Sequence, residues 1–139
     1  MKMDKIVAFL AGVVVLFAGL QAARAVTESF VSGQEAASTV SVRDLQLQNG
    51  TVAGVLVNNS PRLVRHLRLL VRVPWLWNDE RHPGDYSPGR ADFYSVDQDV
   101  PPGRSVPFTV QLSPPLAERS DGRYEAPIVQ VVGFTEVGE

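Results

Sequence analysis

The residues with the greatest capacity for chemistry lie together in one segment of the chain, between positions 75 and 90. Both tryptophans of the protein stand at its start, and a polar loop with two Pro-Gly pairs follows them. Because Trp, Tyr and Arg side chains dominate the energetics of protein interfaces, this segment is a candidate binding surface. The residues that we predict to form it are Trp75, Trp77, Arg81, His82, Tyr86 and Arg90.

Two other interpretations of the same segment stay open. In the first, the tryptophans cap the open end of a β-structure and the loop is only solvated. In the second, the loop holds a metal ion, because carboxylate oxygens and an imidazole suit Ca²⁺ or a transition metal. Its ligands would be Asp79, Glu80, His82 and Asp85. Their spacing matches no loop of known coordination geometry, so we expect neither a bound metal nor another cofactor.

The rest of the chain offers little for catalysis. Nucleophilic hydrolysis needs a Ser or Thr beside an oriented base, and of the two histidines His66 lies among arginines on a predicted strand. Asp97 and Asp99 share a strand face, but any such pair has the separation that glycoside hydrolysis uses. The absence of cysteine excludes disulfides and thiol nucleophiles. We therefore predict a protein that is not an enzyme.

A basic stripe marks the outward face of the same predicted strand. It consists of Arg65, His66, Arg68 and Arg72. The stripe is interpreted as a solvated sheet face whose cations keep the strand from pairing with another chain. The alternative is a surface that recognises anions.

The first 25 residues have the pattern of a secretory signal peptide. Lys2 and Lys5 precede an apolar run over residues 6–20, and Ala23-Arg24-Ala25 offers small residues at a cleavage site. A run of 15 residues is shorter than the roughly 20 that span a bilayer as a helix, which favours cleavage over a retained anchor. We therefore expect a periplasmic or secreted protein.

Charge narrows the class of partner. Without residues 1–25, ten arginines face 14 acidic residues, a net charge of −4. Nucleic acid and anionic lipid are poor partners for such a chain. We expect a protein partner in the cell envelope, and membrane contact only if the signal segment is kept as an anchor.

Beyond the signal, residues 26–39 are predicted to be an extended leader or an early edge strand, and residues 40–139 a single β-domain. From Val40 onward, apolar residues alternate in short segments separated by Gly, Pro and Asn. Asn49-Gly50 predicts a hairpin turn. The expected strands are 42–47, 51–57, 63–77, 91–100, 106–112 and 124–135.

This pattern predicts an all-β fold, an immunoglobulin- or fibronectin III-like antiparallel β-sandwich of six to seven strands, with a small closed barrel as the alternative. The residues expected to face the core are Leu45, Leu47, Val55, Val57, Leu67, Leu69, Val71, Val73, Phe93, Val106, Phe108, Val110, Ile128 and Val132.

Several short motifs also resemble a known family. The succession Gly54-Val55-Leu56-Val57-Asn58-Asn59-Ser60, an alternating strand, Val100-Pro101-Pro102-Gly103 and Phe108-Thr109-Val110 is similar to FxLYD-type and related immunoglobulin-like domains of secreted bacterial proteins. The chain departs from that pattern at Trp75-Leu76-Trp77-Asn78-Asp79, where the family would have a Leu-Tyr-Asp-like stretch. The resemblance implies a sandwich fold and an accessory or binding role, with no reaction.

These observations predict a non-enzymatic protein-interaction or assembly module that uses an edge strand or the 75–90 loop. The alternative is a small ligand- or metal-binding periplasmic protein that uses the same loop.

Overall fold

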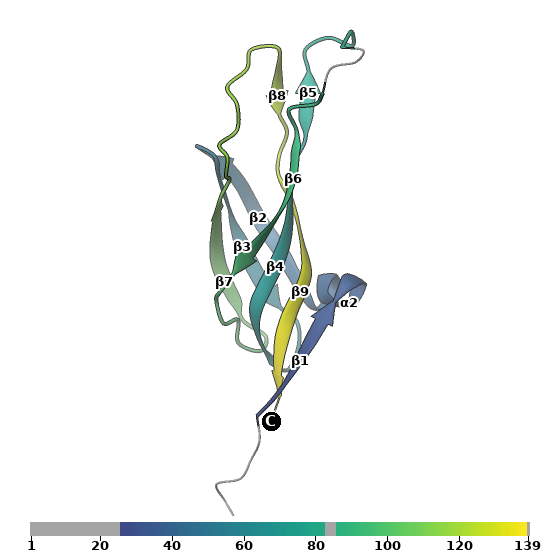
Figure 1. Cartoon of the computed structure of the whole chain (residues 1–139). Coiled ribbons are helices and arrows are strands. Elements are labelled where there is room, and N and C mark those ends of the chain that lie inside the picture. The colour runs from purple at the N-terminus through teal and green to yellow at the C-terminus, as the bar shows by residue number, and fades with distance from the viewer. Residues whose placement is uncertain (1–25, 83–85, 139) are drawn as a thin grey trace, which may run out of the picture.

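Two antiparallel sheets pack face to face in the computed structural model, which describes residues 26–82 and 86–138 (Figure 1). The four-stranded sheet has the order β1-β9-β4-β6, and the three-stranded sheet the order β2-β3-β7. A third, two-stranded sheet pairs β5 with β8. The described elements are β1 (Thr27–Ser32), α2 (Gly33–Thr39), β2 (Val40–Gln48), β3 (Thr51–Asn58), β4 (Leu63–Val73), β5 (Trp75–Trp77), β6 (Arg90–Val96), β7 (Ser105–Gln111), β8 (Gly122–Tyr124) and β9 (Ile128–Gly138).

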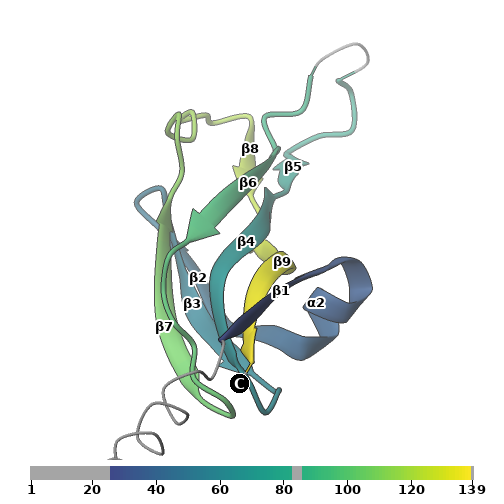
Figure 2. The same cartoon turned by 60° about the horizontal axis from the view of Figure 1, so that its bottom comes forward.

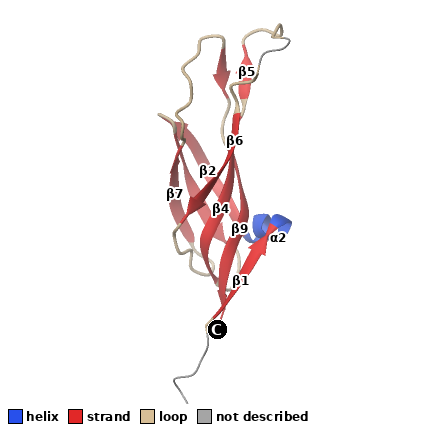
Figure 3. Ribbon diagram, viewed as in Figure 1, coloured by secondary structure: helices blue, strands red, loops and turns tan. Residues whose placement is uncertain are grey.

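The predicted all-β sandwich is confirmed, with nine strands among the described residues instead of six to seven (Figure 3). An immunoglobulin sheet of the variable type has the strand order G-F-C-C′. In this protein β9, β4 and β6 take the F, C and C′ places. The place of the last strand, G, is taken by β1 from the other end of the chain, antiparallel to β9.

The predicted signal peptide lies outside the described residues. No helix within the described part of the chain has the length and apolarity needed to cross a bilayer.

The β2–β3 hairpin forms as predicted. Asn49 and Gly50 have φ angles of 52° and 74°, and two positive φ values in succession are what a tight hairpin turn requires. A bulge at Asp44, with φ 56°, shifts the register of β2. The bulge brings Val42 and Leu45, an odd number of positions apart, to the same side of the strand, where both pack against the core.

The central strand β4 pairs with β9 on one side and with β6 on the other. Its inward face was predicted correctly, since Leu67, Leu69, Val71 and Val73 are all buried. His66 has a φ of 52° at a second bulge and stays exposed.

Other parts of the predicted core were wrong or only partly right. Phe108 and Val110 are buried, whereas Leu45, Leu47 and Val106 are half-buried against the core. Phe93 and Ile128 are more than half exposed, on the outer face of the four-stranded sheet. The half-buried remainder of the predicted set is Val55, Val57 and Val132.

The errors on β3 and β9 have identifiable causes. Both faces of β3 carry apolar side chains, so alternation alone does not identify the inner one; the buried residues are Val52, Gly54, Leu56 and Asn58. On β9, Leu69 pairs with Val131 and Arg68 with Gly133, so Val132 is an extra residue that reverses the alternation.

Three predicted elements also differ from the structure. Only residues 27–32 of the expected extended leader form a strand, because residues 33–39 form α2. The expected strand over 63–77 ends at Pro74, which cannot donate to a sheet ladder, so the tryptophans lie on the separate strand β5. Residues 113–123, which were expected to connect the strands 106–112 and 124–135, include the start of β8.

The helix α2 closes one side of the sandwich. It connects β1, at the edge of one sheet, with β2, at the edge of the other, and packs beside β9 (Figure 2). Ala36 is fully buried in the core and Val40 follows at the start of β2. The helix therefore covers apolar surface where the two sheets part.

Asn58 is the one buried polar residue recorded among the described side chains. Its amide nitrogen donates to the carbonyl oxygens of Arg62 at 2.7 Å, Val100 at 2.9 Å and Pro101 at 3.3 Å. Its amide oxygen accepts from the backbone nitrogen and the hydroxyl of Ser60, at 2.9 and 2.7 Å. One amide therefore joins the end of β3, the start of β4 and the turn before β7.

We expect Asn58→Asp to lower the free energy of unfolding by about 3 kcal/mol, because a carboxylate of the same shape removes the donor and faces buried carbonyl oxygens. Urea denaturation measures the change. Asn59→Asp is the matched control, since Asn59 is exposed, and we expect it to cost less than about 0.5 kcal/mol. Equal stability of the two variants would contradict this role.

Candidate functional site

The predicted binding segment lies at one end of the molecule, where β5 and β8 extend beyond the two main sheets (Figure 1). We call residues 75–82 and 116–124 the aromatic arm. Trp75 pairs with Tyr124 and Trp77 with Gly122 in this two-stranded ribbon. Two backbone hydrogen bonds anchor it, from Glu125 to the Pro74 carbonyl at 2.8 Å and from Asn78 to the Asp121 carbonyl at 3.0 Å.

Aromatic rings form the centre of the arm. Trp75 makes edge-to-face contacts with Tyr124, at 4.8 Å between ring centroids, and with Trp77, at 5.6 Å. Trp77 in turn stacks on the His82 ring at 4.0 Å and 13°. Such ring pairs contribute about 0.5–1.5 kcal/mol each beyond the area they bury. The structure thus brings together three of the six predicted site residues.

An arginine that the sequence analysis missed completes the cluster. The Arg119 guanidinium lies 5.7 Å from the Trp75 ring centroid and 5.3 Å from that of Trp77, which are cation–π distances. It also forms a two-point ion pair with Asp121, at 2.9 and 2.6 Å. Arg119, Asp121 and Tyr124 lie over 40 positions from the tryptophans in sequence, so only the β5–β8 pairing reveals them.

The contact with Arg119 changes the pKa of the Asp121 side chain. Hydrogen bonding by Arg119 holds the pKa of the Asp121 carboxyl below its usual range, and the positive charge of Arg119 acts in the same direction. Asp121 therefore stays ionised through the neutral and mildly acidic range and keeps Arg119 against the indole rings.

Gly122 permits the close approach of the two strands. A Cβ atom at this position would lie 2.4 Å from both the Leu76 carbonyl oxygen and the Trp75 ring. No side chain fits at that distance, so Trp75 can pack against β8 only if residue 122 is glycine.

The other three predicted residues do not join the cluster. Arg81 is exposed and its backbone nitrogen donates to the Asp79 carboxylate at 2.8 Å. Tyr86 is 96% exposed. Arg90 donates to Asp92 on its own strand and to the backbone carbonyl oxygens of Ser113 and Pro114.

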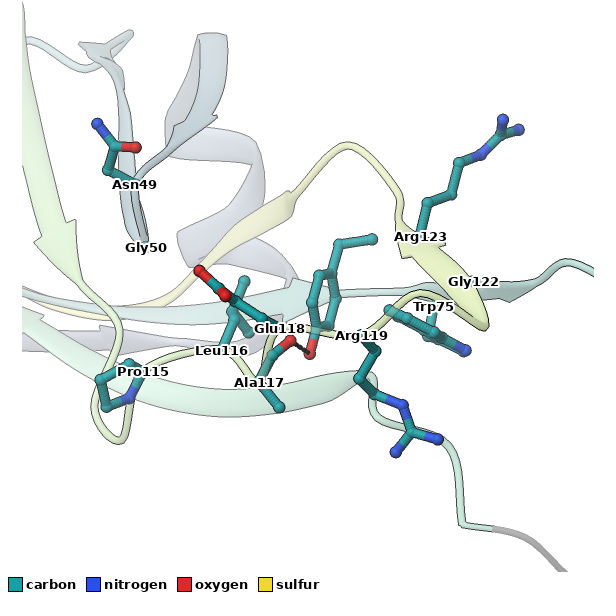
Figure 4. A pocket seen from close by; sticks show the side chains of 11 residues that line it. Asn49, Gly50, Trp75, Pro115, Leu116, Ala117, Glu118, Arg119, Gly122 and Arg123 are labelled. Atoms are coloured by element: carbon teal, nitrogen blue, oxygen red, sulfur yellow. Dashed lines mark hydrogen bonds between the residues drawn. The ribbon is translucent and has the colours of Figure 1, made fainter.

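A shallow open hollow of about 670 Å³ adjoins the arm (Figure 4). The β2–β3 turn, with Asn49 and Gly50, lies on one side of it, and residues 115–119 and the β8 strand lie on the other. The Tyr124 hydroxyl donates to the Ala117 carbonyl at 3.0 Å and holds this wall in place. The Trp75 indole nitrogen is buried and has no hydrogen-bond partner among the described residues.

Residues considered for metal binding or catalysis are dispersed. His82 lies 3.5 Å from Asp79, while Asp85 is outside the described residues. No group of three or more His, Asp or Glu side chains in the described part of the chain is placed to hold a metal ion. His66 lies 3.5 Å from Asp97, and both side chains are exposed.

The basic stripe is partly neutralised by its surroundings. Arg65 lies 3.7 Å from Glu28 and 3.4 Å from Asp99. The Arg68 guanidinium lies over the Phe93 ring, 4.9 Å from its centroid. This arrangement favours the interpretation of a solvated sheet face over that of an anion-binding surface.

Comparison with known proteins adds no family. No protein-family model and no curated protein matches the chain. Among solved structures it is similar to the Salmonella enterica trimeric lipoprotein SadB, with 12% sequence identity and a TM-score of 0.40 over 98% of this chain and 73% of that one. A similarity at this level carries no argument about function.

We expect the tryptophan fluorescence to report the Arg119–Asp121 ion pair, because both tryptophans lie in the arm. A lowered pKa stabilises the folded arm above the ordinary value of 3.8, and this stabilisation is lost as the pH falls through the lowered pKa. The emission spectrum should change as the pH falls below about 4.

The matched variants are Asp121→Asn and Asp44→Asn. Asp121→Asn should shift the emission at pH 7, whereas Asp44→Asn, on the β2 bulge, should leave it unchanged. Far-UV circular dichroism separates this local change from global acid unfolding. A wild-type spectrum for Asp121→Asn at pH 7 would rule out the ion pair as the element that orders the arm.

Proposed function

We propose that the protein is a non-enzymatic interaction or assembly module of the cell envelope that binds a protein partner through the aromatic arm. The observation that carries the proposal is the joint placement of two tryptophans, a tyrosine and an arginine on a ribbon that projects beyond the sandwich. These residue types contribute most of the binding energy at protein interfaces.

The exposure of the arm supports a binding role over simple capping. Trp75 and Trp77 are half-buried and lie outside the core cluster, whereas Leu116 and Tyr124 pack against it. Leu76, between the tryptophans, is 46% exposed. A cap would bury its apolar side chains against the core, while this arm keeps part of its apolar surface accessible.

The position of the arm also suits presentation to a partner. Thr27 pairs with Gly138 at the end of the sandwich opposite to the arm (Figure 1). An N-terminal attachment, whether transient or retained, would leave the arm free to make contacts. The localisation in the periplasm or outside the cell, and the kinship with FxLYD-type domains, are parts of the same proposal.

The alternative, binding of a small molecule, is favoured by the hollow beside the arm. Its volume of about 670 Å³ falls within the usual range for ligand pockets of about 300–1,000 Å³. The residues involved would be Pro115, Leu116 and Tyr124. The loop after the tryptophans, from which this alternative was first predicted, does not line the hollow among its described residues.

A photo-reactive side chain introduced at Leu76 tests the proposal in cells that produce the full chain. We expect covalent adducts with another protein from position 76 and none from Arg104, an exposed control position in the turn before β7. Adding Trp77→Ala should reduce the adduct yield at least fivefold while the circular dichroism spectrum stays that of the parent.

Two results would overturn the proposal. Equal labelling at positions 76 and 104 would indicate non-specific contact. The absence of protein adducts at position 76 would instead agree with small-molecule binding in the hollow.

A further inference from the structure

The two main sheets have four edge strands, and three of these are protected against pairing with another chain. The ladder of β2 is interrupted by the bulge at Asp44. In β7, Pro107 removes a backbone donor. The edge of β6 is held to the 113–114 segment by Arg90 and by a contact between the Tyr94 hydroxyl and the Ser113 nitrogen. Bulges, prolines and covering segments are the usual means of blocking edge-to-edge association.

The fourth edge, β1, has none of these features. Its six residues pair with β9 in one unbroken register, from Thr27 with Gly138 to Ser32 with Gly133, and none is proline. Its single charge, on Glu28, already faces Arg65 at 3.7 Å. An edge of this kind leaves a row of backbone donors and acceptors without partners from a neighbouring strand.

An exposed aromatic residue lies in the middle of this edge. Phe30 is 73% exposed, although it belongs to a sheet. Its ring lies across Gly133 on β9, where an added Cβ would come within 3.0 Å of the ring. The ring is thus fixed on the outer face of the sheet, with most of its surface open to solvent.

We propose that β1 pairs with β1 of a second copy of this chain, antiparallel and about a two-fold axis at Phe30. In an antiparallel pair, residues directly opposite each other point to the same face of the sheet. For both copies to keep their cores on the same side, the two opposed residue numbers must add to an even number. This excludes any register in which Phe30 faces Ser29.

Two registers with an even sum pair the largest number of β1 residues, and the opposed side chains distinguish them. With the axis at Phe30, the rings of the two copies meet, Glu28 faces Ser32, and no like charges are opposed. With the axis at Ser29, Phe30 faces Glu28 and the rings are separated. Cross-strand aromatic pairs are favourable and buried carboxylates are not, so the register centred on Phe30 is preferred.

This pairing would join the four-stranded sheets of two copies into one sheet of eight strands. The two-fold axis is perpendicular to the sheet, so the aromatic arms would project from opposite ends of the dimer. This inference concerns a different surface from the arm and stands independently of the proposed function.

Single-cysteine variants of the full chain test the register directly, because the natural sequence contains no cysteine. Opposed residues have Cα atoms about 4.5–5.5 Å apart, within the range of a disulfide. Phe30→Cys should therefore form a disulfide-linked dimer on mild oxidation. Glu28→Cys should not, because the two copies of position 28 lie four residues, about 13 Å, apart along the strands. A mixture of the Glu28→Cys and Ser32→Cys chains should cross-link.

A charge substitution tests the association itself. Phe30→Lys places two ammonium groups opposite each other and should raise the dimer dissociation constant at least tenfold in sedimentation equilibrium. Ile128→Lys is the control, since Ile128 is also about half exposed on the same outer face but lies on the interior strand β9. It should leave the constant within twofold of the wild type.

Three outcomes would overturn the proposal. The first is a wild-type chain that stays monomeric at concentrations of about 100 µM or more. The second is equal cross-linking of Phe30→Cys and Glu28→Cys. The third is unchanged association of Phe30→Lys. Either of the last two outcomes would also indicate that the copies associate through the apolar N-terminal run, which lies outside the substituted positions.

Discussion

The amide of Asn58 sets the geometry on which the sandwich depends. It lies where the chain leaves the three-stranded sheet at the end of β3 and crosses to β4 in the other sheet. Its amide nitrogen donates to the backbone carbonyl oxygens of Arg62, Val100 and Pro101, each of which also accepts a second hydrogen bond. Because the crossing is fixed, β4 enters its sheet with Leu67 and Leu69 facing inward, and β9 and β6 can pair on either side of it.

Local chemistry made much of this fold predictable from the sequence. Asn49-Gly50 supplies the two positive φ angles of a hairpin turn, so β2 and β3 were located nearly to the residue. The alternation along β4 was equally clear, because three of the four outward residues, His66, Arg68 and Arg72, are basic. The hairpin turn and the alternation both depend on residues that are adjacent in the sequence, so both can be inferred from one sequence.

The errors arose where the structure departs from regular alternation or depends on distant pairing. The extra residue Val132 reverses which residues of β9 face the core, and no residue type in its neighbourhood predicts this bulge. In β3, valines occupy both faces, and the inner face is marked only by Gly54 and Asn58, two residues that apolar alternation overlooks. The inward position 54 is a glycine because the Phe108 ring and Leu45 fill the space that a side chain would need.

The candidate site shows the same division. Trp75, Trp77 and His82 could be identified because unusual residues cluster in a short segment. Arg119 and Asp121 could not, since a turn-like segment with an arginine and an aspartate is common on any protein surface. Their role follows from Gly122, whose lack of a side chain lets β8 approach Trp75 and bring the distant arginine over both indole rings.

The pairing of Thr27 with Gly138 has a mechanical consequence. Tension applied between Thr27 and Gly138 would pull β1 away from β9 perpendicular to the strands, so that their hydrogen bonds would break one after another and never share the load. The domain would therefore yield at low force by peeling of its N-terminal strand, while Asn58 and the interior strands stay in place.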